Sequence, residues 1–265
     1  MMRALWTAAT GMTGQQMNVD VISNNLSNVN TTAYKKDRIE FKDLIYSQMN
    51  KGYNIEDNTS AAPMQVGFGA APSATLKDFS VGNFSASENP LDFALDGAGF
   101  FTLQNEKGDV VYTRDGSFKV STIDDERILV NSQGYPVLDD AGETIPLGDI
   151  DLDNIIVSTE GKISFNIDGN ITDTGITLGV VQFANPAGLE SLGSNNYGVT
   201  EASGNPVWET NENRSTVMQN YLEGSNVNLV DEMVNLIVAQ RAYEINSKIV
   251  QASDDMLSQA NNLKR

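Results

Sequence analysis

Apolar residues near the N-terminus recur every three or four positions. The stripe, whose only polar member is Gln15, consists of Leu5, Ala8, Met12, Gln15, Val19, Ile22, Leu26 and Val29. Alternating steps of three and four place these side chains along one seam of a helix, as in a heptad repeat. Asn30, Thr31 and Thr32 end the pattern. The sequence therefore predicts an N-terminal helix with one apolar seam.

A second heptad stripe occupies the C-terminal region. Its members stand seven residues apart, at Leu222, Leu229, Leu236, Tyr243, Val250 and Leu257. Further apolar residues flank it at Val230, Met233, Val234, Ile237, Ile245, Ile249 and Met256. The pattern predicts a helix over residues 228–262, in which Asn228 caps the first turn and Asp231 and Glu232 complement the positive end of the helix dipole.

The two predicted helices offer each other a partner for their apolar seams. We expect them to pair as a coiled coil, either parallel or antiparallel, because burial of apolar side chains favours it. The residues expected in the packing seams are Leu5, Met12, Val19, Ile22, Leu26, Leu229, Met233, Leu236, Tyr243, Val250 and Leu257. Periodicity alone fits a simple two-helix stalk equally well.

The middle of the chain changes to a period of two. Alternation over residues 163–167 and 177–183, with Asp-Gly pairs at Asp96, Asp115 and Asp168, predicts antiparallel strands joined by tight turns. The fold class expected is α+β, with a central antiparallel β domain. We expect a terminal helical domain from residues 1–35 and 223–265, an extended connecting segment at 36–69 and a mainly β domain at 70–222.

Composition and charge exclude several functions. The chain has 265 residues, no cysteine, no histidine and a net charge of −18, so imidazole bases, thiolate nucleophiles and common zinc sites are excluded. The net charge is +1 in residues 1–40 and −2 in 223–265, which leaves −17 for 41–222. This acidity disfavours nucleic acid. The sequence has no continuous run of 18 apolar residues and no signal-peptide pattern, so neither membrane insertion nor a cleaved leader is expected.

Acidic clusters provide two weaker hypotheses. The spacing of Asp149, Asp151, Asp153 and Glu160 resembles a calcium-binding loop, but Asn154 replaces the usual glycine, so a solvated acidic turn is favoured. The pairs at 124–125 and 139–140 suggest a glycosidase only remotely, because both stretches are turn-like. We expect neither enzyme activity nor a cofactor.

Amide side chains are frequent outside the apolar seams. They include Asn24, Asn25, Asn28, Gln240, Asn246, Gln251, Gln259 and Asn261. Amides can satisfy one another between helices without burying charge, which favours assembly over a solvated stalk. The alternative from another class is a secreted adhesin or binding module carried on a coiled-coil stalk.

Three stretches carry a resemblance to a known family. Ser23–Lys36 (SNNLSNVNTTAYKK) resembles the signature of the rod, hook and hook-basal-body family of bacterial flagella, matched at Asn24, Asn25, Asn28, Thr31, Tyr34 and Lys35. Ala33 stands where that signature usually has glycine. Asn89–Gln104 with Val111–Val120 resembles the start of the family's β domain. Ser225–Leu257, including Gln240, Arg241, Tyr243 and Glu244, is similar to the C-terminal helix of its distal rod members.

The resemblance implies a structural rod subunit that is exported uncleaved by the flagellar type III apparatus. It implies helical self-assembly into a hollow drive shaft within the cell envelope or periplasm, which transmits torque to the hook and serves as the export channel. Other rod and hook proteins, and a basal-body ring bushing, are the further partners that it implies. Proximal rod and hook-type axial proteins are the alternatives within the family.

Overall fold

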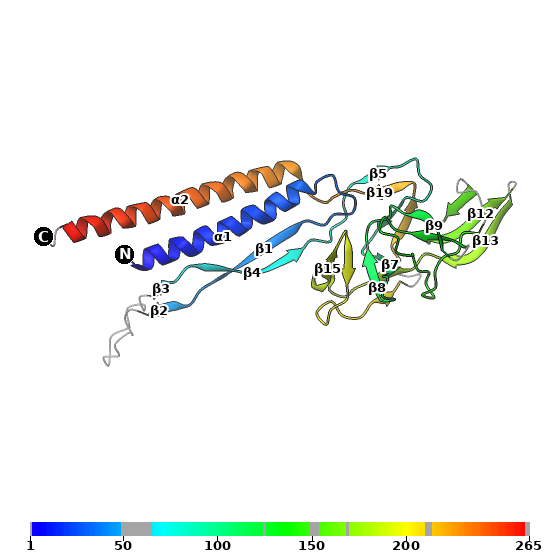
Figure 1. Cartoon of the computed structure of the whole chain (residues 1–265), viewed down its shortest axis with the longest axis horizontal. Coiled ribbons are helices and arrows are strands. Elements are labelled where there is room, and N and C mark those ends of the chain that lie inside the picture. Colours follow the sequence, from blue (N-terminus) through cyan, green and yellow to red (C-terminus); the bar gives the residue numbers. More distant parts are fainter. Residues whose placement is uncertain are drawn as a thin grey trace, which may run out of the picture. The chain divides into compact units, whose positions relative to one another are not determined.

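The computed structural model describes residues 2–48, 65–123, 126–148, 154–167, 170–209 and 214–262. The chain forms two compact units, coloured along the sequence in Figure 1. The first unit consists of Met1–Ser27, Asp37–Leu76 and Asn228–Arg265. The second unit consists of Asn28–Lys36 and Lys77–Val227.

Two long helices dominate the first unit. Helix α1 spans Met2–Ser27 and α2 spans Leu229–Asn262, close to the ranges that the heptad stripes predict. The carboxamide oxygen of Asn228 accepts a hydrogen bond from the backbone nitrogen of Val230 at 3.1 Å, which confirms the predicted cap. No helix in the described part of the chain is long and apolar enough to cross a membrane.

Strands accompany α1 in the first unit. The segment expected to be an extended connection contains β1 (Asp37–Asp43), β2 (Tyr46–Gln48) and β3 (Gln65–Gly67), and residues 49–64 lie outside the described part. Strand β1 pairs with β4 (Ala70–Lys77), and β2 pairs with β3. Helix α1 lies between α2 and the β1–β4 ribbon (Figure 1).

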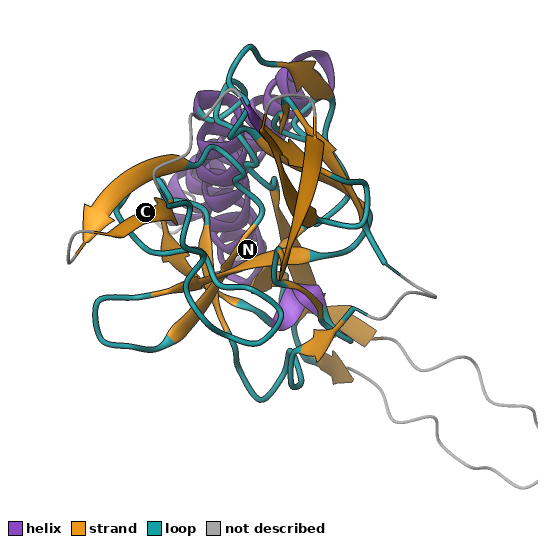
Figure 2. Cartoon of the chain, turned by 90° about the vertical axis from the view of Figure 1, so that its right-hand side faces the viewer, coloured by secondary structure: helices purple, strands orange, loops and turns teal. Residues whose placement is uncertain are grey.

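The second unit is built from antiparallel strands, drawn in orange in Figure 2. They are β5 (Phe84–Ala86), β6 (Phe93–Asp96), β7 (Phe100–Gln104), β8 (Val110–Thr113), β9 (Lys119–Ile123), β10 (Glu126–Val130), β11 (Ile155–Val157), β12 (Lys162–Ile167), β13 (Asn170–Thr177), β14 (Val180–Gln182), β15 (Glu190–Gly193), β16 (Asn196–Gly198), β17 (Val207–Trp208), β18 (Thr216–Gln219) and β19 (Tyr221–Glu223). A six-stranded sheet has the order β15-β16-β8-β7-β14-β17. Strands β11–β13 form a second sheet, and β9–β10, β6–β18 and β5–β19 are two-stranded pairs. The α+β class and the antiparallel β domain are confirmed.

Strand β7 supplies the core of the second unit from both of its faces. Phe101 belongs to a large apolar cluster and packs edge-to-face on Phe118, with ring centres 5.2 Å apart. Phe100, the preceding residue, belongs to a second, aromatic cluster with Phe183 and Tyr197. Successive residues of a strand point to opposite faces, so β7 has apolar packing on both sides.

Ala33 adopts a conformation that accounts for the glycine usual at this position of the family signature. Its φ is +54°, in the left-handed region, and its side chain is only 1% exposed. Glycine reaches this region without a steric penalty, whereas a residue with a Cβ atom does not. In this chain a residue with a Cβ atom therefore occupies a backbone conformation that favours glycine, and it carries the strain of that conformation.

Ala33→Gly is expected to stabilise the protein by about 0.5–1 kcal/mol, because relief of left-handed strain outweighs the larger entropy of the unfolded glycine. Thermal unfolding of purified protein measures the effect. Ala94→Gly is the matched control, since Ala94 is equally buried in β6 but has no positive φ, and it should destabilise. Equal losses in both variants would contradict the strain at Ala33.

Candidate assembly surface

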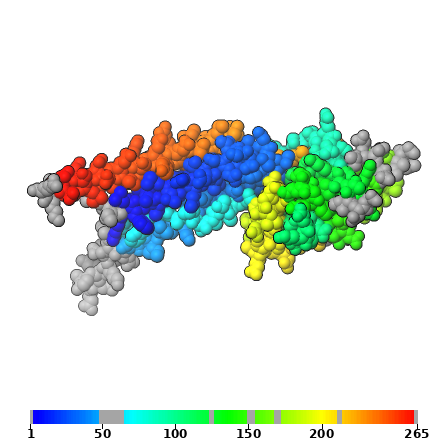
Figure 3. Space-filling view, in the orientation of Figure 1, coloured from blue at the N-terminus to red at the C-terminus, as the bar shows by residue number. Residues whose placement is uncertain are grey.

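Helices α1 and α2 pack against each other in an antiparallel arrangement (Figure 3, blue and orange to red). A methyl group at Gly11 would lie 2.8 Å from the amide nitrogen of Asn246, so the two helices approach closely there. Further along α1, Val19 lines a groove of about 380 Å³ with Gln240 and Tyr243 of α2. The numbering rises on one helix as it falls on the other, which resolves the orientation that periodicity leaves open.

The residues expected in the packing seams differ in burial. On α1, Ile22 is buried, and Leu5, Met12, Val19 and Leu26 are half-buried. On α2, Leu236, Val250 and Leu257 are half-buried, whereas Leu229, Met233 and Tyr243 are 42%, 46% and 42% exposed. The fully buried positions of α2 are Glu232, Ala239 and Ser253. Small and polar side chains thus contribute to the less exposed side of α2.

A second side of α2 is apolar and exposed. We call it the exposed apolar face: Val230, Val234, Ile237, Val238, Ile245, Ile249 and Met256, each 42–66% exposed. At about 100° per residue, Val234, Val238 and Ile245 point roughly opposite to Leu236 and Val250. The heptad pattern predicts several of these residues as flanks of one seam. In the structure they form a second, exposed side, although a helix that is apolar all round is typically buried. Helix α1 packs against the other, less exposed side of α2.

Two amide side chains of the N-terminal signature, those of Asn25 and Asn28, make hydrogen bonds within the chain. Asn25 is 1% exposed, and its side chain donates to the carbonyl of Asp37 at 2.8 Å and accepts from the amide of Asp37 at 2.9 Å. The side-chain oxygen of Asn28 accepts from the hydroxyl of Thr31 at 3.1 Å. Asn24 is exposed. Asn25 is therefore unavailable to a neighbouring helix, and the reasoning from an amide-rich outer face is wrong for this residue.

The signature ends in two buried residues. Tyr34 is 7% exposed, and the ammonium of Lys77 lies 5.4 Å from the centre of its ring. Lys35 is fully buried. In the C-terminal signature, Arg241 and Glu244 instead form an exposed ion pair at 2.7 Å.

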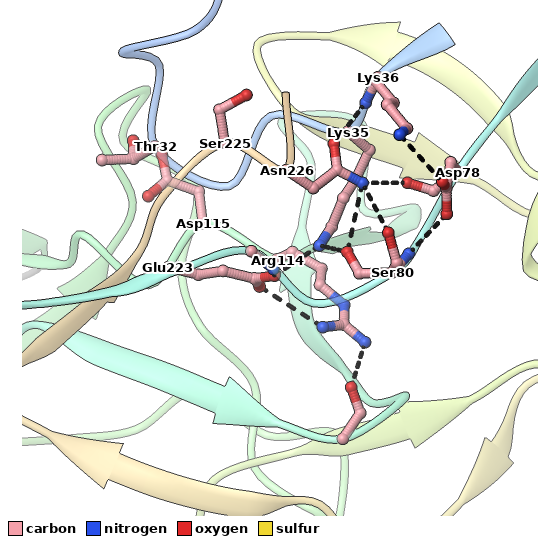
Figure 4. Close-up of polar contacts among 12 residues, drawn as sticks. Thr32, Lys35, Lys36, Asp78, Ser80, Arg114, Asp115, Glu223, Ser225 and Asn226 are labelled. Atoms are coloured by element: carbon pink, nitrogen blue, oxygen red, sulfur yellow. Dashed lines mark hydrogen bonds and ion pairs between the residues drawn. The ribbon is translucent and has the colours of Figure 1, made fainter. Parts of the chain in front are cut away.

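Lys35 belongs to a buried ion cluster in the second unit (Figure 4). Its ammonium donates to the carboxylate of Glu223 and to the carbonyl of Ser80, the latter at 2.7 Å. Arg114 contacts the other carboxylate oxygen of Glu223 at 3.4 Å and lies 5.2 Å from the ring centre of Phe100. Burial lowers the pKa of Lys35, and the negative charge of Glu223 opposes this effect. The heptad pattern gives no signal for this cluster, and only the family resemblance draws attention to Lys35.

The acidic candidates are only partly covered by the structure. Asp149, Asp151, Asp153 and the pair at 124–125 lie outside the described residues. Glu160 is exposed and pairs with Lys162 at 2.8 Å, which lowers the pKa of the Glu160 carboxyl. The Asp139 carboxylate accepts from the amides of Ala141 and Glu143, as expected in a turn. Within the described ranges, no three acidic side chains are grouped so as to hold a metal ion.

Three family models match the chain. They are described as flagella basal body rod protein at residues 5–35, flagellar hook protein FlgE/F/G D1 domain at residues 94–165, and flagellar basal body rod FlgEFG protein C-terminal at residues 218–263. Both helices and much of the β unit are thus covered.

Full-length relatives agree with these matches. The flagellar basal-body rod proteins FlgG of Borreliella burgdorferi and Bacillus subtilis are 47% and 35% identical to the chain, and each alignment covers 100% of both proteins. The flagellar hook-basal body complex protein FlhP of Bacillus subtilis is 33% identical over the same full coverage. The chain therefore belongs to the flagellar basal-body rod protein family.

Proposed function

We propose that this rod-family subunit builds the distal part of the rod, by helical self-assembly into a hollow shaft. The shaft transmits torque to the hook and serves as the export channel. The 47% identity to a FlgG rod protein supports a rod subunit over other members of the family. The alignment covers the full length of both proteins, so the similarity includes both helices and the β region.

The exposed apolar face of α2 is the main structural support for self-assembly. Its seven residues are 42–66% exposed, and a monomer in water would leave this surface unpaired. A helix that is apolar on two opposite sides can contact α1 on one side and a neighbouring subunit on the other. We propose that this face meets a different surface of the neighbour, because a heterologous contact propagates as a filament when the rotation between subunits does not close into a ring.

The domains expected from the sequence correspond, in this proposal, to layers of the assembled tube. We propose that residues 1–35 and 223–265 form a coiled-coil inner layer, that the segment near residues 48–69 helps to stiffen the tube, and that the β region of 70–222 faces outward. The net charge of −17 over residues 41–222 supports an outward, solvated position for most of that region.

The proposed partners follow from the family. They are further copies of the chain, other rod and hook proteins, the type III export apparatus and a bushing ring of the basal body. The site proposed is the basal body within the cell envelope or periplasm, reached without a cleaved signal peptide. Structural packing is the role proposed, without catalysis, cofactor, nucleic acid or membrane insertion.

Two other functions predict different outcomes. A proximal rod or hook-type axial protein would also form filaments, and the 33% identity to FlhP favours keeping this alternative. An adhesin or binding module on a coiled-coil stalk would form a discrete oligomer instead.

Electron microscopy of basal bodies from a strain lacking the protein tests the proposal. We expect rods that stop short and carry no hook, rescued by the full chain but not by a chain without residues 1–30. Loss of the entire rod would favour a proximal subunit. Intact rods and hooks in the deletion strain would contradict an axial role.

A further inference from the structure

Three segments of the second unit lie next to the points where the chain passes between its two units. The chain passes between the units after Ser27, Lys36, Leu76 and Val227. The three segments adjoin the last three of these passages and comprise residues 33–36, 78–80 and 223–226. Two sets of contacts, both inside the second unit, connect these segments (Figure 4).

The side chain of Asn226 contacts the other two segments at once. Its oxygen accepts from the backbone amide of Lys36 at 2.8 Å, and its nitrogen donates to the carbonyl of Asp78 at 2.7 Å and to the hydroxyl of Ser80 at 3.1 Å. The backbone amide of Asn226 also donates to the carbonyl of Tyr34 at 3.3 Å. One amide side chain thus fixes the spacing of all three segments.

The buried ion cluster connects the same segments a second time. Lys35 comes from the first segment and donates to Ser80 in the second and Glu223 in the third. The backbone carbonyl of Glu223 accepts from the amide of Ala33 at 2.8 Å. Arg114 directly follows strand β8 and therefore anchors the cluster to the six-stranded sheet.

Stability alone is a poor explanation for this arrangement. Removing three charged groups from water is costly, and buried ion clusters can often be replaced by apolar residues without loss of stability. Charged hydrogen bonds are directional, however, whereas apolar contacts tolerate sliding. What the cluster provides beyond apolar packing is a fixed geometry.

We propose that Lys35, Arg114, Glu223 and Asn226 act as positioning residues, a clamp that holds the three segments in one arrangement and so gives every subunit the same conformation for assembly. Regular helical stacking requires this uniformity, because an error in each subunit accumulates along the shaft. The clamp itself is a property of the monomer and can be measured there. Its consequence for assembly rests on the proposed function.

Two variants of the full chain test the clamp. Asn226→Ala removes the amide contacts, and the triple variant Lys35→Met, Arg114→Met, Glu223→Leu replaces all three charges by apolar side chains. Asn185→Ala is the matched control, because the Asn185 amide donates to the carbonyl of Ala202 in an exposed loop of the same unit. Hydrogen exchange and thermal unfolding are measured on the monomers, and rods are examined in the complemented strain.

We expect exchange at the Lys36 amide to rise at least tenfold in Asn226→Ala, and exchange at the Gly82 amide, which donates to Glu223 at 2.9 Å, to rise similarly in the triple variant. Amides of β7 and β8 should keep wild-type protection, and rods should become irregular or lose their hooks. The control should match wild type in all three measurements.

Unchanged hydrogen exchange at the Lys36 amide in Asn226→Ala would overturn the clamp. A uniform rise in exchange throughout the second unit would also overturn it, because it would mean that the clamp residues only stabilise the unit. If the triple variant does not fold, the exchange and rod measurements on Asn226→Ala test the clamp by themselves. Faster exchange with normal rods would overturn the link to assembly. If wild-type protein forms no rods, the proposed function fails while the exchange data still test the clamp.

Discussion

Replacing Val238 by aspartate is expected to abolish polymerisation while the monomer stays folded. Val238 is 62% exposed, so the change removes little packing within the monomer. In an assembled shaft, the new carboxylate would be buried against apolar side chains of a neighbour. An unpaired buried charge costs about 3–5 kcal/mol, which corresponds to at least about a hundredfold weaker contact.

Two measurements check this prediction. Circular dichroism of the purified variant should give the helix content of wild type, and complementation of the deletion strain should give no hook-bearing rods. Asn235→Asp is the matched control, since it adds the same charge at an exposed polar position of the same helix. Normal rods with Val238→Asp would show that the exposed apolar face is not a contact between subunits.

The helices could be predicted from the sequence because their signals are local. Heptad spacing and the Asn228 cap predict the first residue of α2 to within one position. Both signals depend on residues within a few helical turns. The orientation of the pair could not be predicted, because the same spacing suits parallel and antiparallel helices. Close approach at Gly11 is visible only once Asn246 has been placed opposite it.

The β1–β4 ribbon beside α1 could not be predicted from the sequence, for a different reason. Strand β1 is mostly exposed and carries five charged residues in seven, so it lacks the apolar alternation that indicates a strand. Its partner β4 begins 27 residues after β1 ends, which makes the pairing non-local. The sequence therefore predicts an extended connection at residues 36–69, and it assigns β4 to the central β domain without pairing it with β1.

The buried ion cluster is the part of the site that is hardest to predict from the sequence. Lys35 and Glu223 are 188 positions apart, and lysine and glutamate are ordinarily exposed. Only the family signature singles out Lys35, without giving it a partner. Ala33, by contrast, carries a readable signal, because a signature glycine often marks a positive φ.

Glu223→Gln is expected to destabilise the second unit severely. The carboxylate lies between two cations, and the side chains of Lys35, Arg114 and Glu223 are at most 1% exposed. A neutral amide leaves both cations buried without a counter-charge, which should cost about 3–5 kcal/mol. Thermal or urea unfolding of the purified variant measures this loss. Glu160→Gln removes an exposed pair with Lys162 and should leave the unfolding midpoint unchanged.

The pH dependence of Glu223→Gln separates lost charge from lost shape. Burial already lowers the pKa of Lys35, and removal of the neighbouring anion should lower it further. Between this lowered pKa and the ordinary lysine value, the unfolded chain binds more protons than the folded chain, so stability rises with pH. Wild-type Lys35 behaves in the same way from a less strongly lowered pKa. The deficit of the variant relative to wild type should therefore narrow as the pH rises from the Lys35 pKa of the variant to that of wild type, above which both folded proteins have lost the proton. A deficit that is constant over this range would mean that packing, and not the charge of Lys35, is what Glu223 supports.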